Sequence, residues 1–237
     1  MTRHRPFATA LFAVLVGLAA LPQASQAGTE NRELPAFSEI SVRNGATVQV
    51  SQGEQASVRV TADDAVLPLL ETVVEKDRLE IRWKRGENAY DLMRRHGRVT
   101  VAVVMPRLTA LSVAGSGDVE VAAFNTPKLS VSVAGSGSAR LDKLVGDELG
   151  VRVAGSGDIR GSGQVSSLTI SVAGSGDVGL AELKADEVSV RIAGSGDVKV
   201  HADKTLKVSI AGSGDIVYSG DPVVTRSVAG SGNISKR

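Results

Sequence analysis

Residues 168–180 read Leu-Thr-Ile-Ser-Val-Ala-Gly-Ser-Gly-Asp-Val-Gly-Leu, and the central tetrapeptide Ala-Gly-Ser-Gly occurs seven times in the C-terminal half. The steps between the first glycines of successive copies are 20, 20, 19, 20, 18 and 18 residues. A period of about 20 residues indicates a repeat architecture, in which one structural unit stacks on copies of itself. Because glycine tolerates positive φ and lacks a Cβ, we expect both glycines of every copy to form structural turns that nest between coils. These residues are Gly115, Gly117, Gly135, Gly137, Gly155, Gly157, Gly174, Gly176, Gly194, Gly196, Gly212, Gly214, Gly230 and Gly232.

The residues around each copy alternate between apolar and polar. Two and four positions before the first glycine stand aliphatic residues such as Val172 and Ile170, while the position between them holds Ser or Arg. Period-two alternation buries one side of a strand, and β-branched residues fit such a surface. The pattern predicts an all-β, stacked β-solenoid (a β-helix) of about seven regular coils with an irregular N-terminal portion. The alternative, an antiparallel sandwich of hairpins, does not need the same inward columns in every copy.

The chain divides into a leader and one domain. Residues 1–27 carry Arg3 and Arg5, an apolar stretch over 7–21 and small residues before Ala27, which is typical of a signal peptide. Residues 28–36 are predicted to be a linker, and 37–237 a single β-solenoid domain. Within it we expect irregular N-terminal coils over 37–107, regular repeats over 108–222 and a C-terminal cap over 223–237. The cap is inferred because Arg226 and Lys236 stand in inward columns, which suits the exposed end of a solenoid.

Residues 87–97 form the most polar part of the N-terminal portion. We expect an exposed loop there, with Arg94, Arg95 and Arg98 solvated; a ligand-binding loop is the alternative.

Composition limits the functional classes. The chain has no cysteine, so neither a disulfide framework nor a cysteine-linked lipid is expected. Removing residues 1–27 leaves 25 basic against 26 acidic residues, a net charge of −1, which offers no electrostatic footprint for nucleic acid. No stretch after residue 27 is apolar enough to span a membrane, which requires about 20 residues. We therefore expect an exported protein, periplasmic or extracellular.

Three segments together resemble a known bacterial family. They are Phe37-Ser38-Glu39-Ile40-Ser41-Val42, the Met105-Pro106 pair that leads into the first repeat, and the repeated Ala-Gly-Ser-Gly-Asp followed by Val or Ile. Over residues 36–237 the chain is similar to the auto-transporter adhesin head GIN domain family. The resemblance implies a β-helix-like fold similar to that of pectin lyases, without conserved catalytic residues. It also implies a role in adhesion, with an envelope or surface component, polysaccharide or protein, as the partner.

A column of acidic residues follows the turns. Asp118, Asp158, Asp177, Asp197 and Asp215 occupy it, with Ser138 and Asn233 at the equivalent places. Such carboxylates could bind cations or a ligand rich in hydroxyl groups. We favour turn capping, because Asp, Ser and Asn all accept hydrogen bonds from nearby backbone N–H groups in tight turns.

Cofactors and catalysis receive less support. Calcium prefers six to eight oxygen ligands, and one carboxylate per turn supplies few, so we expect no metal and no cofactor, with calcium as a minor alternative. His96 and His201, the histidines after residue 27, have no evident catalytic partner in the sequence. The prediction is a non-enzymatic exported binding or adhesion module of the cell envelope. An envelope scaffold protein without a small ligand is the first alternative, and a carbohydrate-active enzyme the second.

Overall fold

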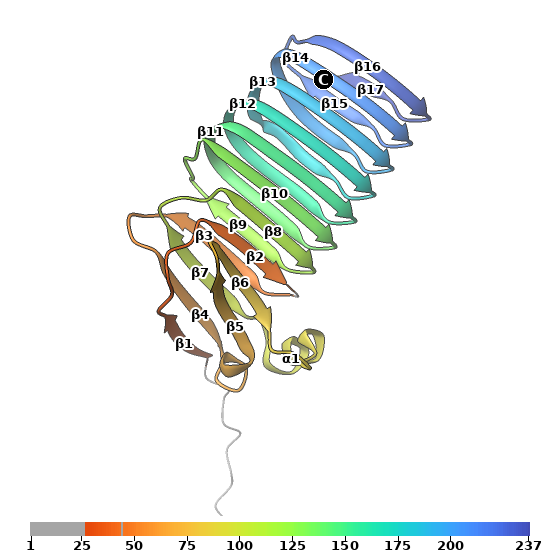
Figure 1. Cartoon of the computed structure of the whole chain (residues 1–237). Helices are drawn as coiled ribbons and strands as arrows, with labels where there is room; N and C mark the ends of the chain where they lie inside the picture. The colour runs from red at the N-terminus through yellow and green to blue at the C-terminus, as the bar shows by residue number, and fades with distance from the viewer. Residues whose placement is uncertain (1–26, 44) are drawn as a thin grey trace, which may run out of the picture.

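The repeats stack into a rod, as the computed structural model shows for residues 27–43 and 45–237 (Figure 1). Each coil places one strand on either side of the core, and the strands of successive coils pair in parallel. Strands β11 to β14 are long, because each runs from one side of the rod round to the other. The strands of this half are β8 (Ala110–Gly115), β9 (Asp118–Ala122), β10 (Lys128–Gly135), β11 (Ser138–Gly155), β12 (Asp158–Gly174), β13 (Val178–Gly194), β14 (Val198–Gly212), β15 (Ile216–Ser219), β16 (Val223–Gly230) and β17 (Ile234–Lys236).

The copies of the tetrapeptide lie directly over one another. Gly135 pairs with Gly155, Gly155 with Gly174 and Gly174 with Gly194, and the same register continues to Gly230. All strands of the repeats pair in parallel, which excludes the sandwich of hairpins. The predicted β-solenoid is confirmed, with about six turns between the seven tetrapeptide corners.

The core is made of stacked aliphatic columns. Val131, Val151, Ile170, Val190 and Val208 succeed one another across the pairs of strands, and each is at most 5% exposed. Burying one such side chain contributes about 1.5–3 kcal/mol. The buried residues form one continuous cluster from Phe37 to Ile216, so the irregular portion and the repeats share a core.

The irregular portion adds two coils that lack the tetrapeptide. Strands β2 (Glu39–Arg43) and β3 (Thr47–Gln52) pair in parallel with β8 and β9. Strands β6 (Arg78–Trp83) and β7 (Thr100–Met105) pair in parallel with β2 and β3 on their other side. The order in space is therefore β6–β7, β2–β3, β8–β9, which differs from the order in the chain.

Antiparallel strands close the N-terminal end of the rod. β5 (Leu70–Glu75) pairs with β6, β4 (Ser57–Asp63) with β7, and β1 (Ala27–Arg32) with β4, while a 3-10 turn, η1 (Leu67–Leu69), precedes β5. Residues 28–36, predicted to be a linker, therefore contribute most of β1. This strand lies at the edge of the sheet with both sides largely in solvent, so it lacks the alternation that marks the other strands.

Residues 87–97 contain a helix, α1 (Ala89–His96), so the prediction of a loop was wrong there. The Asn88 side chain accepts hydrogen bonds from the N–H groups of Tyr90 and Asp91, which is standard N-terminal capping. Leu92 and Met93 pack against the core, which gives a mostly polar segment one buried side.

The C-terminal residues 223–237 form β16 and β17. Arg226 lies opposite Val208 and Lys236 opposite Tyr218, and both charged residues are exposed. Their role as a cap stays a prediction. The predicted signal peptide lies outside the described residues except for Ala27. No helix in the described ranges has the length and apolarity needed to cross a membrane.

Candidate functional site

The Gly-Ser-Gly corners stack along one edge of the rod, which we call the glycine edge. Gly174 has a φ of +126°, and a Cβ added there would lie 2.3 Å from the carbonyl oxygen of Gly155. Gly176 has no such φ, but its Cβ would lie 2.2 Å from the carbonyl oxygen of Gly157. The first glycine is therefore required for both conformation and space, and the second for space, whereas the sequence led us to expect positive φ at both.

The aspartate column runs beside the glycine edge and ties successive coils together. Asp177 accepts a hydrogen bond from the backbone N–H of Asp197 at 2.8 Å, and Asp197 accepts one from Asp215 at 2.9 Å. Asp158 and Asp215 bond in the same way to Asp177 and Asn233, while Asp118 accepts the hydroxyl of Ser138 at 2.6 Å. Each donor belongs to the next coil, not to the same turn. These contacts favour a structural role, and ligand binding by the column stays a prediction.

Two further placements concern metals and catalysis. Among the described residues, no three His, Cys, Asp or Glu side chains gather in a way that could hold a metal ion. His201 has partners that the sequence did not reveal: its Nδ1 lies 2.8 Å from the Ser219 hydroxyl and its Nε2 2.9 Å from Asp203. Ser219 is opposite His201 in the next coil, so the contact again joins stacked coils, and the Asp203 side chain is 49% exposed.

The two broad sides of the rod differ in charge. On the side that starts after the glycine edge, cations lie beside acids: Arg140 contacts Asp142 at 3.0 Å and Arg160 lies 3.6 Å from Asp158. The hydrogen bond that Arg140 donates to the Asp142 carboxylate raises the pKa of Arg140 above its ordinary value. This side therefore carries acids and cations together, and some of them are paired with one another.

The opposite side carries a surface without acids. It consists of the outward residues one, three and five positions before each first glycine, on β8, β10, β16 and the C-terminal parts of β11 to β14. In these strands all such positions hold Ser, Thr, Ala, Gly, Arg or Lys. We call this surface the acid-free face. Its polar members are Ser112, Ser130, Ser132, Arg152, Thr169, Ser171, Ser189, Arg191, Lys207, Ser209, Thr225 and Ser227.

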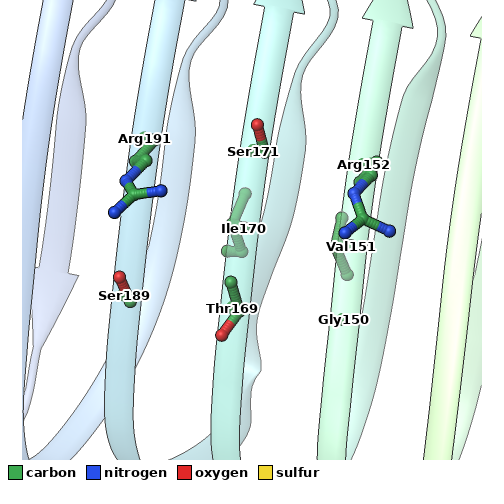
Figure 2. Close-up of a pocket in the computed structure, with 8 residues that line it drawn as sticks. All are labelled: Gly150, Val151, Arg152, Thr169, Ile170, Ser171, Ser189 and Arg191. Carbon is green, nitrogen blue, oxygen red and sulfur yellow. The ribbon is translucent and has the colours of Figure 1, made fainter.

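Arg152 and Arg191 frame a depression in the middle of the acid-free face. Figure 2 shows their guanidinium groups on either side of the strand that carries Thr169 and Ser171, with Val151 and Ile170 turned toward the core. Gly150 and Ser189 complete the lining of this depression, which measures about 290 Å³. Among the ion pairs in the described part of the chain, none involves Arg152, Arg191 or Lys207.

The same sheet changes character toward its N-terminal end. There Arg78 pairs with Glu39 at 2.6 Å and Arg82 with Glu71 at 3.1 Å. Arg43 reaches the buried carboxylate of Glu80 at 3.1 Å. Cations on β2 and β6 are therefore neutralised within the protein.

The cations at the centre of the acid-free face are left for solvent or a ligand. In the sequence, Arg152 and Arg191 are polar members of the alternation, and they were not predicted to form a site. The signal available in the sequence was the lack of acids in these rows.

The comparisons with known proteins agree with the fold. Residues 36–222 match the model of a family described as "Putative auto-transporter adhesin, head GIN domain". The chain belongs to this family. The match confirms the resemblance drawn from the tetrapeptide, and it covers the irregular coils as well as most of the repeats of the GIN domain. No curated protein matches the sequence.

Several solved structures share the fold of this GIN-domain chain. A "putative adhesin" from Bacteroides fragilis is 21% identical with a TM-score of 0.83, covering 90% of this chain and 98% of that one. A "putative lipid binding protein" from Parabacteroides distasonis is 27% identical with a TM-score of 0.73, covering 89% and 96%. A "putative adhesin" from Parabacteroides merdae is 20% identical with a TM-score of 0.70, covering 90% and 96%. These likenesses show the fold, and the description of the family as an adhesin supports a binding module.

Proposed function

We propose that this protein is an exported, non-enzymatic adhesion module that binds a component of the cell envelope or of another surface on its acid-free face. The observation that carries the proposal is the contrast in charge pairing. Arg152, Arg191 and Lys207 form no ion pair, whereas Arg43, Arg78 and Arg82 on β2 and β6, and Arg140 and Arg160 on the opposite side of the rod, each lie beside an acid. Free cations on a rigid sheet offer charge-assisted hydrogen bonds to a ligand without first breaking internal ones.

The shape of the face suits an extended ligand better than a small one. Outward side chains of parallel strands project from a rigid scaffold, and the small residues between Arg152 and Arg191 leave the depression between them open to solvent. Ser and Thr hydroxyls supply donors and acceptors along the whole row. A surface polysaccharide or an extended protein segment fits such a row, whereas a small substrate normally lies in a concave, largely apolar site.

Catalysis has weaker support. The group formed by Ser219, His201 and Asp203 contains the residue types of a nucleophile and a base. These residues, however, lie at an edge of the rod. Turnover would also need donors positioned for a developing oxyanion. We infer that this contact stabilises the stacking of β14 and β15.

Export is supported by the sequence of residues 1–27, with two arginines, an apolar stretch and small residues before Ala27. We expect the mature chain to begin at Gly28 and to function in the periplasm or outside the cell. Mature N-terminal sequencing after expression in a bacterial host, together with fractionation, tests this. Retention of residues 1–27 in the cytoplasm would contradict it.

The binding proposal is tested with mature protein (residues 28–237) against immobilised envelope fractions and purified surface polysaccharides. We expect saturable binding that is lost when Ser171 is replaced by Glu, because an acid then stands between the two free arginines. Gly179→Glu is the matched control, since it adds the same charge to the opposite side, where a new Cβ finds its nearest neighbour 3.5 Å away. Absence of saturable binding to every surface, or equal losses in both variants, would favour the scaffold alternative.

A further inference from the structure

The acid-free face also indicates the chemical class of the ligand. We propose that it binds a linear acidic polysaccharide that lies across the strands, along the axis of the rod, with the carboxylates of alternate sugars against Arg152 and Arg191. This inference rests on the proposed binding function and makes it specific.

The charge of the ligand follows from the face itself. Arg152 and Arg191 are exposed and form no ion pair, and Lys207 adds a further cation on the next strand, where it lies opposite Ser189 in the neighbouring column. Guanidinium groups bind carboxylates through parallel N–H···O bonds. The three rows of this face hold no acid, and the nearest acids on the same strands, Glu148 and Glu187, lie four residues before Arg152 and Arg191. An anionic ligand is therefore the complement of the face.

The spacing of the arginines selects a polymer with a repeat. Arg152 pairs in register with Ser171, and Ser171 with Arg191, so the arginines occupy the same column two strands apart. Two inter-strand steps correspond to about 9.6 Å along the rod. In an extended 1,4-linked polymer of six-membered sugars, the length of one sugar is close to one such step, so alternate sugars can meet the two arginines.

The intervening coil suits the sugar between two bound carboxylates. In a ribbon-like polymer, alternate sugars turn their carboxylates to the same side, so the sugar between them presents hydroxyl groups to the protein. At this place the protein presents Ser171 and Thr169, both exposed (Figure 2). Hydroxyl groups can donate to and accept from sugar hydroxyls in either direction.

Other polyanions fit less well. The face has no aromatic residue on which the bases of a nucleic acid could stack, and no large apolar residue that could enter a membrane. Protein interfaces are usually centred on aromatic and other large anchors, which this face also lacks. A sugar with a carboxylate can be bound by guanidinium groups and hydroxyls without aromatic or large apolar residues.

The test uses mannuronate-rich alginate, a 1,4-linked polymer with one carboxylate per sugar, in the presence of a chelator to prevent gelation by calcium. The matched control polymer is its propylene glycol ester, which keeps the backbone and neutralises most of the carboxylates. We expect the mature protein to bind the free acid and to bind its ester at least about tenfold more weakly. Binding should weaken further as salt rises from about 0.1 M to about 1 M, where the Debye length falls from about 10 Å to about 3 Å.

Protein variants separate the arginines from net charge. Arg152→Ser with Arg191→Ser should abolish binding and still fold, because serine occupies this column at Ser132, Ser171 and Ser209. Arg140→Ser with Arg160→Ser removes the same charge from the opposite side and should leave binding unchanged. A third variant, Ser171→Arg with Arg191→Ser, keeps the net charge but places the two arginines on adjacent strands, and should lose about tenfold in affinity.

The outcomes distinguish this inference from the broader proposal. Equal binding of acid and ester, or equal affinities of the two double-serine variants, would overturn the acidic polysaccharide. Binding to anionic phosphatidylglycerol vesicles or to DNA with no binding to alginate would also overturn it. If alginate is not bound but envelope fractions still are, and Ser171→Glu abolishes that binding, the adhesion module stands without this ligand. If no surface is bound, both proposals fail.

Discussion

The two edges of the rod solve the same problem, turning the chain from one side to the other, in different ways. At the glycine edge every copy has the same length, and the register of the glycines continues unbroken from coil to coil. At the opposite edge, which we call the variable edge, the register shifts in three successive pairs of strands. The changes of repeat length from 20 to 19 and 18 residues are absorbed there.

The two edges differ in the groups that make contact between successive coils. At the glycine edge, backbone contacts backbone so closely that even a Cβ has no room. At the variable edge such close backbone contact is limited to single positions, among them Gly146, Gly163 and Gly220, and is not repeated in every coil. Side chains supply other contacts between coils there, such as Lys204 with Asp186 at 2.9 Å. Side chains can adjust to an insertion, whereas stacked peptide groups cannot. A solenoid can therefore vary in length along one edge when the other is fixed.

The largest effect is expected from filling the glycine edge. Gly174→Val places a β-branched residue at a φ of +126° with its Cβ 2.3 Å from a backbone oxygen, so we expect a loss of about 3 kcal/mol or more. Gly179→Val, in the neighbouring strand, has ordinary space around its Cβ and should change stability by less than about 1 kcal/mol. Urea unfolding monitored by circular dichroism measures both. Similar midpoints for the two variants would remove the steric account of the glycine edge.

An insertion tests the two edges directly. Two glycines inserted between Ser175 and Gly176 should displace the N–H groups that bond to the Gly155 carbonyl, at a cost of about 2 kcal/mol. The same two residues after Asp203, at the variable edge, should cost less than about 1 kcal/mol, because lengthening a loop is inexpensive. Thermal melts of the two insertions should therefore separate by several degrees. A reversed order of the melting temperatures would show that the variable edge is the more constrained one.

The aspartate column should contribute less. Asp177→Ala removes the acceptor for the Asp197 N–H, and we expect a loss of about 1 kcal/mol. Asp177→Asn keeps an oxygen in the same place and should lose less than half of that. Denaturant titration of both variants measures the difference. If Asn is as damaging as Ala, the charge of the column matters more than its hydrogen bonds, and cation binding becomes the better explanation.

The smallest effect concerns an exposed ion pair near the end of the variable edge. The hydrogen bond from Lys236 lowers the pKa of Asp221 below its ordinary value of 3.8. Because the pKa of Asp221 is lowered, the pair contributes to folding stability at pH values above the ordinary pKa. This contribution is lost as the pH falls through the lowered pKa. Lys236→Gln should therefore raise the pKa of Asp221, which NMR titration of its side-chain carbon can follow, with little change in stability. An unchanged titration would show that the pair does not persist in solution.

The repeated half of the fold could be predicted because residues close together in the sequence determine its strands and corners. Each window of about 20 residues specifies its strands by alternation and its corner by glycine, and parallel stacking follows once the windows are identical. The N-terminal portion could not be predicted in the same way. β1 has too few apolar residues to show alternation, and α1 depends on the core that receives Leu92 and Met93.

The candidate site shows the same limit. The aspartate column was visible in the sequence, because its members follow each corner at one fixed position. Its bonds to the next coil were not visible, since they depend on the rise between coils. The lack of ion pairs at Arg152 and Arg191 was not predicted. It depends on which residues of the neighbouring coils lie beside the two arginines, and none of these is acidic.

The placement of β2–β3 between β6–β7 and β8–β9 has a consequence for the order in which the protein can fold. A repeat can dock as soon as the preceding coil exists, so the C-terminal half can assemble progressively from short-range contacts. The β2–β3 pair must wait for partners that follow much later in the chain, and such non-local contacts slow folding. A chain synthesised or translocated from its N-terminus would hold this segment without its neighbours until residues 110–122 arrive. The first coils of the stack are thus completed by strands from the middle of the sequence, not from its beginning.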